Sequence, residues 1–439
     1  MSDVSSVNPA RTRSRTVVAL VLAFAVALAA LLLTGARPPD PDTPAGPDAI
    51  PSNAMFNSNV QSAPGPFYTP PSPLPNGLPG TVIKSEPIAD APPGLLAFRI
   101  MYLSTNANGN PTAVTGMVIQ PFAVGPATGR PIVAFAHGTT GIGRECGISQ
   151  APFTPGTTGA SMFDPRIRPL VDQGYVVTAT DYEGEGAPGL PTYLVESTEA
   201  YNVLDSLRAA VYLEPQTVNA SKMAIYGHSQ GGHAALSAAS LAASYAPELQ
   251  LRGVVASAPG LVPALPLAIK TLVANPGTPK EAATRAAYIL NIAASWSATF
   301  PDQFQASDVL TPEGIAALPL ALAYCYGNLA PRLTEPFSTY VKSAPNDSLI
   351  KTISQNMPVT RRIYQPVLMM QGLADTDVSP PLTIAAAQAL CQLGTTVALH
   401  TTANDTHETL IWSARPTELD WIAARFRGQA APNTCGGQQ

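Results

Sequence analysis

Charged residues are scarce in this sequence. They make up 12% of its 439 residues, about half the usual quarter, whereas apolar residues make up 46%. The formal net charge is −5, so the chain has no basic footprint for nucleic acid. No internal repeat is visible, and none of the four cysteines has the C-x-x-C spacing of a zinc or redox site. The composition therefore favours a folded protein with a large core and argues against disorder and nucleic-acid binding.

The first 36 residues have the pattern of a secretory signal. Arg11, Arg13 and Arg15 precede an unbroken apolar run over 17–33, and small residues follow at 34–36. The run is long, so an uncleaved membrane anchor is the competing interpretation. Either way we expect the rest of the chain to be secreted or associated with the cell envelope. The four cysteines suit such an oxidising compartment and predict two disulfides, for which the sequence alone leaves three pairings open.

The remaining chain divides into four parts by its pattern. Residues 37–76 are rich in proline and predict a linker or an arm lying over the surface. Residues 77–258 begin with two antiparallel strands and continue with buried strands that alternate with helices, which predicts a mostly parallel sheet covered on both faces. Residues 259–362 contain Ala/Leu-rich helical segments and no clear buried strand, so we expect an inserted, mainly helical cap. Residues 363–439 resume the sheet and close with a helix.

The individual elements follow from their apolar spacing. The expected strands are 98–103, 112–119, 131–136, 175–180, 222–226, 251–257, 366–371 and 395–401, and the expected helices are 197–213, 280–299, 312–328, 381–393 and 408–427.

One stretch joins a short apolar strand to an alanine-rich helix through Gly227-His228-Ser229-Gln230-Gly231. It is a G-x-S-x-G pattern in the strand–turn–helix context that a nucleophile elbow requires. The turn is so tight that the residues two before and two after the serine cannot carry bulk, which glycine tolerates. The serine hydroxyl then stands at the positive end of the following helix. Ser229 is the candidate nucleophile; the alternative is a Gly-rich turn with an N-capping serine, which needs no chemistry.

A serine hydroxyl needs a base to take its proton and a carboxylate to orient that base. His407 follows the loop between the last strand and the final helix, where a base can reach the serine. We prefer it to His400, which lies within the strand, because the order Ser-Asp-His is that of the α/β-hydrolases. The alternative for His407 is an exposed histidine at a helix N-terminus. His137, His228 and His233 are expected to be structural.

The acid and the oxyanion donors complete the set. Asp375, just beyond a strand, is the first choice for the acid and Asp377 the second; an aspartate in an Asx turn without a catalytic role is the alternative. Acyl transfer also needs hydrogen-bond donors for the oxyanion. We assign these to the backbone N–H groups of Gln230, after the nucleophile, and Thr139, in a loop that could also be a flexible turn. This chemistry calls for no metal or organic cofactor.

With these pieces placed, the sequence resembles the secretory lipase family, the lipase A-like branch of the α/β-hydrolases. The matching stretches are AHGTTG at 136–141, TDYEG at 180–184, YNVLDSLRA at 201–209, YGHSQGGHA at 226–234 and GLAD at 372–375, within a similarity over roughly 64–435. The resemblance implies an α/β-hydrolase fold and hydrolysis of triacylglycerols or other carboxylic esters. It also implies the disulfides Cys146–Cys325, tying core to cap, and Cys391–Cys435.

The sequence departs from the family in places that bear on chain-length preference. Glu185 stands where an apolar residue would help to line the acyl pocket, and His228 and Gln230 replace other neighbours of the serine. We expect a secreted serine ester hydrolase whose cap either parts at a lipid surface or is an ordinary packed subdomain. The alternatives are a short-chain esterase, an acyltransferase, a serine peptidase of the prolyl-oligopeptidase kind, and a non-catalytic binding module. That kind of peptidase needs a long propeller region with repeats, and a binding module typically loses a member of the triad.

Overall fold

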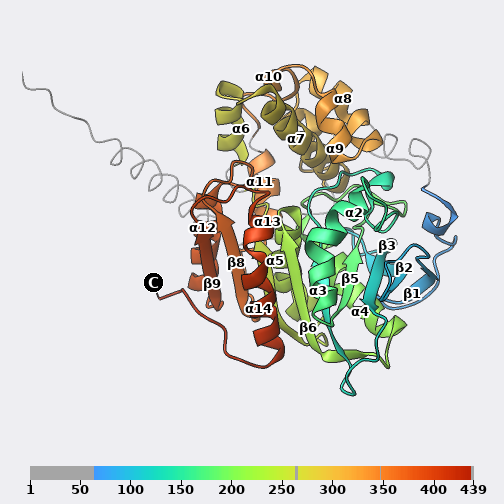
Figure 1. The fold of residues 1–439 in the computed structure, drawn as a ribbon. Helices are drawn as coiled ribbons and strands as arrows, with labels where there is room; N and C mark the ends of the chain where they lie inside the picture. The colour runs from blue at the N-terminus through green and yellow to red at the C-terminus, as the bar shows by residue number, and fades with distance from the viewer. Residues whose placement is uncertain (1–63, 263–264, 347, 437–439) are drawn as a thin grey trace, which may run out of the picture.

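The computed structural model describes residues 64–262, 265–346 and 348–436 (Figure 1). The signal or anchor expected at 1–36 and most of the arm expected at 37–76 lie outside these residues. The described end of the arm contains the 3-10 helix η1 (Pro66–Tyr68). It packs on the core, because Tyr68 is buried and its hydroxyl lies 2.9 Å from Ser149 Oγ. Among the described residues, no helix is long and apolar enough to cross a membrane.

The described residues form a nine-stranded sheet in the order β1-β2-β3-β5-β4-β6-β7-β8-β9. The pairs β1–β2, β2–β3 and β3–β5 are antiparallel, and all the following pairs are parallel. The predicted fold class, a mostly parallel sheet with an antiparallel start, is confirmed. The strands are β1 (Val82–Pro87), β2 (Leu95–Thr105), β3 (Pro111–Pro121), β4 (Arg130–Ala136), β5 (Val176–Thr180), β6 (Val218–His228), β7 (Leu251–Ser257), β8 (Val367–Gly372) and β9 (Val397–Thr402).

Helices cover both faces of the sheet (Figure 1). On one face lie α4 (Glu196–Leu213), α5 (Gln230–Tyr245) and α12 (Pro380–Gln392). On the other lie α3 (Arg168–Asp172) and α14 (Arg415–Phe426), which share a second apolar cluster. The shorter elements η2 (Arg144–Cys146), α2 (Thr158–Met162), the π-helix η3 (Phe163–Ile167) and α13 (Leu410–Ser413) complete these layers.

The single helix expected at 408–427 is instead two, α13 and α14. A proline, Pro416, occupies the first turn of α14. Proline has no N–H and suits the first turn of a helix but not its interior, so a new helix begins there.

Between β7 and β8 the chain forms the mainly helical insertion, gathered at one end of the sheet in Figure 1. Its apolar core is continuous with the core under α4 and α5. The helix expected at 312–328 is two helices, because Tyr324 and Cys325 are extended and the disulfide holds Cys325. The described helices are α6 (Leu265–Ala274), α7 (Pro279–Thr299), η4 (Ala306–Asp308), α8 (Pro312–Ala323), α9 (Tyr326–Leu329), η5 (Ala330–Arg332), α10 (Phe337–Tyr340) and α11 (Ser348–Gln355).

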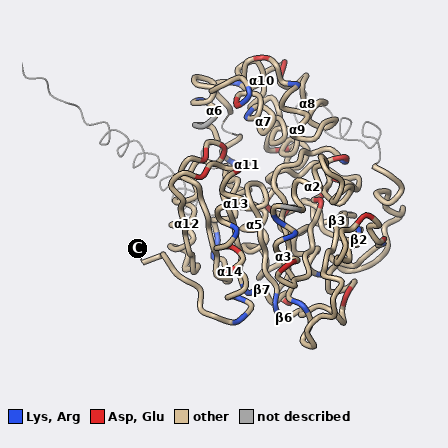
Figure 2. The backbone as a smooth tube through the Cα atoms, viewed as in Figure 1, with Lys and Arg blue, Asp and Glu red and all other residues tan. Residues whose placement is uncertain are grey.

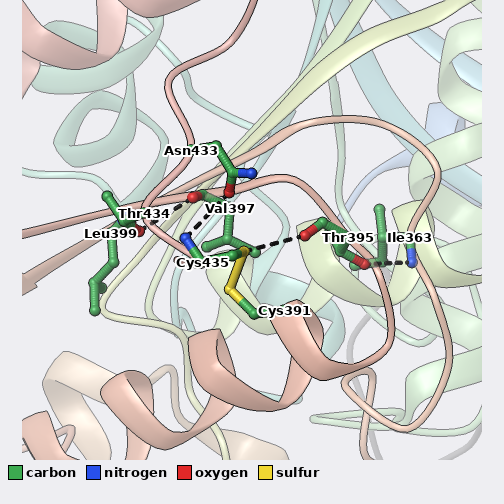
Figure 3. The surroundings of a disulfide bond; sticks show 8 residues. All are labelled: Ile363, Cys391, Thr395, Val397, Leu399, Asn433, Thr434 and Cys435. Carbon is green, nitrogen blue, oxygen red and sulfur yellow. Dashed lines mark hydrogen bonds between the residues drawn. A yellow bond between two sulfur atoms is a disulfide. The ribbon is translucent and has the colours of Figure 1, made fainter. Parts of the chain in front are cut away.

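Two disulfides, Cys146–Cys325 and Cys391–Cys435, are present, as the resemblance implied. The second holds the C-terminal segment beside the edge strand β9 (Figure 3). There the N–H of Thr434 donates to Val397 O over 2.7 Å, and the N–H of Leu399 donates to Thr434 Oγ1 over 3.1 Å. An edge strand presents unpaired backbone groups, so this segment covers part of the exposed edge of the sheet.

Charged residues are scattered along the described chain, and most of the backbone in Figure 2 belongs to residues other than Lys, Arg, Asp and Glu. Several carboxylates are nevertheless buried, among them Asp181 and Glu185 after β5 and Glu199 in the first turn of α4. Burying a charge is costly unless it is paired or neutralised. Glu185 and Glu199 have polar partners beside the candidate site, Thr140 and Gln230.

Candidate active site

Ser229 occupies the strained turn between β6 and α5. Its φ of 61° and ψ of −123° are rare for a residue with a side chain. Hydrogen bonds hold this conformation: its N–H donates to Ser257 O over 2.9 Å, and its carbonyl accepts from the N–H of Gly260 over 2.8 Å. The serine side chain makes no capping hydrogen bond to the helix. The conformation is therefore that of a nucleophile elbow and does not match an N-capping serine.

The two glycines flanking this turn have no room for a side chain. A Cβ on Gly227 would lie 2.0 Å from Gly231 O, and a Cβ on Gly231 would lie 1.9 Å from Ala136 O. The crowding expected from the G-x-S-x-G spacing is thus present on both sides of Ser229. It lets the helix approach strand β4 and the loop that follows it.

Asp375 and His407 are hydrogen-bonded to each other. The Nδ1–H of His407 donates to Asp375 Oδ2 over 2.8 Å, and both residues are buried. The other oxygen, Oδ1, accepts from the N–H groups of Asp377 and Val378, each over 2.8 Å. Gln371 Nε2 donates to Oδ2 over 3.2 Å. Asp375 therefore forms an Asx-type turn with one oxygen and orients the imidazole with the other, leaving Nε2 of His407 as the acceptor.

His407 also lies beside the elbow. The Nε2–H of His228, the residue before Ser229, donates to His407 O over 3.1 Å, and the two rings are 4.4 Å apart. Burial, with the neighbouring His407, holds the pKa of His228 well below its usual range, which disfavours a charged ring at this position. By contrast, His400 is exposed on β9 and Asp377 is exposed in its loop. The structure thus pairs the first-choice acid with the first-choice base and places the base beside the residue before Ser229; the catalytic roles of all three remain a prediction.

The loop after β4 lies against the nucleophile. A Cβ added to Gly138 would be 3.8 Å from Ser229 Cβ and 3.4 Å from His228 O. The hydroxyl of Thr139 lies 2.8 Å from the hydroxyl of Tyr193, which fixes the loop from the side. Gln230 begins α5, where backbone N–H groups have no partner within the helix. Both expected oxyanion donors therefore belong to segments that border Ser229.

The cap is attached to this loop. The N–H of Tyr326 donates to Thr140 O over 2.8 Å, and the disulfide joins Cys146 to Cys325 next to it. Gly141 lies so close that its Cβ would be 2.9 Å from the Cα of Cys325. The position of the expected oxyanion loop therefore depends on the cap.

A buried ion pair between Glu199 and His233 holds the first turn of α5, directly after Ser229. The sequence did not indicate this pair. Glu199 accepts from Gln230 Nε2 over 2.9 Å and pairs with His233 Nδ1 over 2.7 Å. His233 Nε2 faces Asn356 O at 3.1 Å, so both ring nitrogens donate and the imidazole is charged. Burial alone would lower the pKa of His233, but Glu199 raises it overall. A histidine and a glutamine on an alanine-rich helix were the only sequence signal of this network.

Glu185 lies behind the loop after β4. Its Oε2 accepts from Thr140 Oγ1 over 3.0 Å and lies 3.5 Å from His137 Nε2. Burial raises the pKa of Glu185 well above its usual value and lowers the pKa of His137 to about 4. Burial therefore disfavours the charged form of both groups. The substitution that departs from the family pattern supports the loop through Thr140 and His137.

Comparison with solved structures identifies the fold as that of an α/β-hydrolase. Lipase A from Candida antarctica, in its closed state, matches 86% of this chain and 89% of that chain with a TM-score of 0.71 and 22% identity. The rice cell wall degrading esterase LipA from Xanthomonas oryzae matches 80% of this chain and 98% of that chain with a TM-score of 0.63 and 17% identity. At these identities the likeness concerns the fold alone.

Sequence comparison finds similarity to a narrower group. Residues 150–268 match the secretory lipase family, and residues 322–427 match the prolyl oligopeptidase family. Lipase 2 of Candida albicans is 26% identical over 84% of this chain and 82% of its own length. The chain is thus similar to the secretory lipases, and the predicted resemblance is confirmed.

Other relatives match over a shorter stretch. A probable inactive lipase from Mycobacterium tuberculosis is 30% identical over 44% of this chain, and lipase 5 of Candida albicans is 29% identical over 42%. These two matches span less than half of each relative's length, 45% and 41%. One of these relatives is named a probable inactive lipase, so similarity to this group does not by itself establish activity.

Proposed function

We propose that the protein is a serine carboxylic ester hydrolase, a lipase or esterase, that acts through Ser229, His407 and Asp375. The observation that carries this proposal is the 2.8 Å hydrogen bond between His407 and Asp375, beside a serine held at a φ of 61°. A non-catalytic binding module has no need to retain a strained serine, a base and an acid in one place.

In the proposed reaction, Ser229 Oγ attacks the ester carbonyl while His407 Nε2 takes its proton. Asp375 stabilises the imidazolium, and the N–H groups of Gln230 and Thr139 hold the oxyanion. The C–O bond then breaks, and the alcohol leaves with the proton from His407. Water attacks the acyl-enzyme in the same way, giving its proton to His407 and releasing the carboxylic acid and the free serine.

The proposed substrates are triacylglycerols or other acyl esters, with the cap over the acyl group. The names of the relatives support a lipase or an esterase. The polar residues Glu185, His228 and Gln230, which depart from the family pattern, leave the proposed chemistry unchanged. We further propose that the protein acts outside the cytoplasm, in contact with lipid. The match to secretory lipases, the two disulfides and the N-terminal signal pattern support this location.

A panel of p-nitrophenyl esters from acetate to palmitate tests the proposal. The natural protein and Ser244→Ala, an exposed change later on α5, should hydrolyse the panel, and Ser229→Ala should lose about 10³-fold or more in kcat. Turnover restricted to short chains would make the protein an esterase. Transfer of the acyl group to an added alcohol in preference to water would make the protein an acyltransferase. No turnover at any chain length would favour a binding module.

A further inference from the structure

Glu199 lies fully buried in the first turn of α4, and its carboxylate accepts three hydrogen bonds. Its Oε1 accepts from Gln230 Nε2 and from the backbone N–H of Leu194, each over 2.9 Å. Its Oε2 accepts from His233 Nδ1 over 2.7 Å. An ionised carboxylate has about four acceptor sites, so three of them are used here. They are divided between two segments of the chain, the start of α5 and the turn before α4.

The first of these segments carries one expected oxyanion donor. Gln230 is the first residue of α5 and directly follows Ser229, and its backbone N–H is the expected donor. Its side chain is buried and bonded to Glu199, and His233, one turn further along the same helix, is bonded to the other carboxylate oxygen. Two anchoring points on one turn fix both its position and its orientation. The direction of the Gln230 N–H therefore depends on Glu199.

The second segment is connected to the other expected donor. Leu194 has a φ of 54°, which is uncommon for a residue with a side chain, so its conformation needs support from its surroundings. The hydrogen bond from its N–H to Glu199 gives this support. The preceding residue, Tyr193, is buried, and its hydroxyl lies 2.8 Å from the hydroxyl of Thr139. The turn that Glu199 holds therefore also positions Thr139, whose backbone N–H is the second expected donor.

We propose that Glu199 is a positioning residue of the ester hydrolysis, which sets the spacing between the two oxyanion donors, Gln230 and Thr139. This inference rests on the proposed function. The two donors belong to distant segments of the chain, and Glu199 is bonded directly to one segment and through Leu194 and Tyr193 to the other. Preorganised donors stabilise the oxyanion only at hydrogen-bond distance, and a displacement of about 1 Å can cost about 10²-fold in rate.

A pair of substrates distinguishes this role from a purely structural one. In p-nitrophenyl thionobutyrate a sulfur replaces the carbonyl oxygen of p-nitrophenyl butyrate, and sulfur is the weaker hydrogen-bond acceptor. The kcat/KM for the oxygen ester divided by that for the sulfur ester therefore reports on the oxyanion donors. We call this quotient the oxygen-to-sulfur ratio. A loss of stability that leaves the donors in place lowers both rates equally and does not change the ratio.

Glu199→Met keeps a side chain of similar length and removes all three acceptor contacts. We expect kcat for the oxygen ester to fall about 10- to 100-fold with KM nearly unchanged, and the oxygen-to-sulfur ratio to fall about 10-fold. Glu196→Met is the matched control, because Glu196 is buried in the same turn but its carboxylate bonds Ser240 and pairs with Arg361. This control should keep the natural ratio even where its melting temperature is lower.

Three further variants test the two connections separately. Gln230→Met and Tyr193→Phe each remove one side-chain bond and leave the backbone donor in place, so each should lower the ratio several-fold. They also decide the question if Glu199→Met does not fold. Glu199→Gln should restore the natural ratio to within about 3-fold, because its oxygen can still accept from Gln230 and Leu194 while its NH2 faces Nδ1 of a neutral His233.

The remaining outcomes separate this inference from the proposed function. A folded Glu199→Met with the natural ratio would show that Glu199 only holds the fold, and unchanged ratios in both Gln230→Met and Tyr193→Phe would lead to the same conclusion. An equal fall of the ratio in Glu196→Met would assign the effect to general loosening of α4 and overturn the inference. In each of these cases hydrolysis by the natural protein leaves the proposed function standing. No turnover of p-nitrophenyl butyrate by the natural protein would remove the proposed function, and this inference with it.

Discussion

Replacing Asp375 by asparagine should remove catalysis while keeping the fold. The carboxylate accepts four hydrogen bonds: two from backbone N–H groups on Oδ1, and two from His407 and Gln371 on Oδ2. An asparagine would keep its single oxygen toward the two backbone groups and turn its NH2 to His407. His407 would then have to accept at Nδ1, so its proton would move to Nε2. In that tautomer it cannot take a proton from Ser229.

The size of the loss follows from the alternative amide orientation. Turning the asparagine oxygen toward His407 leaves two buried backbone N–H groups unpaired, at about 1–3 kcal/mol each. The productive orientation is thus disfavoured by about 2–6 kcal/mol, a factor of roughly 30 to 10⁴. Asparagine also lacks the negative charge that stabilises the imidazolium, which lowers kcat further. We therefore expect kcat to fall roughly 10²- to 10⁴-fold.

The assay is the steady-state rate with p-nitrophenyl butyrate, with the melting temperature as the measure of folding. Gln371 retains the carbonyls of Gly372 and Val378 as acceptors, so the fold should survive the substitution. Asp377→Asn is the matched control and should retain most of the activity. If Asp375→Asn kept more than about a tenth of kcat, or if Asp377→Asn lost as much, the assignment of the acid would be wrong.

Three further predictions concern stability and the elbow. Changing both Cys146 and Cys325, which close a loop of 179 residues, to serine should lower the free energy of unfolding by up to about 5 kcal/mol in denaturant titrations, and a change below 1 kcal/mol would refute it. Gly231→Ala should abolish ester hydrolysis, because its Cβ would meet Ala136 O; unaltered kcat would contradict the crowding. Burial raises the pKa of Glu418 to about 7, so its carboxyl binds a proton more tightly in the folded state, and the stability it contributes below pH 4.5 is lost as the pH rises through 7. The melting temperature of Glu418→Gln minus that of the natural protein should therefore be higher at pH 8 than at pH 5. Equal differences at both pH values would refute this.

The sequence predicted the sheet well where strands are buried on both faces. Such strands, for example β4, β5 and β7, are continuous apolar runs, and their bounds lie within two residues of those expected. The edge strand β1 was missed, because half-exposed residues such as Lys84 and Glu86 interrupt its pattern. The helices at 158–172 were missed because Pro165 and Pro169 break the helical spacing, and proline is accepted here only in a π-helical segment and a first turn.

The site was predictable to the extent that its residues are tied to local turns. Ser229 belongs to a motif whose glycines are required by the tight turn. Asp375 and His407 follow parallel strands, so both are expected at the carboxyl end of the sheet. The Glu199–His233 pair and the position of Glu185 depend on contacts between distant segments, which no local pattern encodes. The buried polar groups on α7 could not be foreseen either, because the alanine-rich sequence predicts a helix without saying which face is buried.

Labelling with a fluorophosphonate tests the central claim most directly, because this reagent forms a covalent adduct with an activated serine. Intact-mass and peptide analysis should find one adduct per chain, on the peptide that contains Ser229. Ser229→Ala should take up none, and His407→Gln should react far more slowly. An unlabelled natural protein, or equal labelling of Ser229→Ala, would contradict the account.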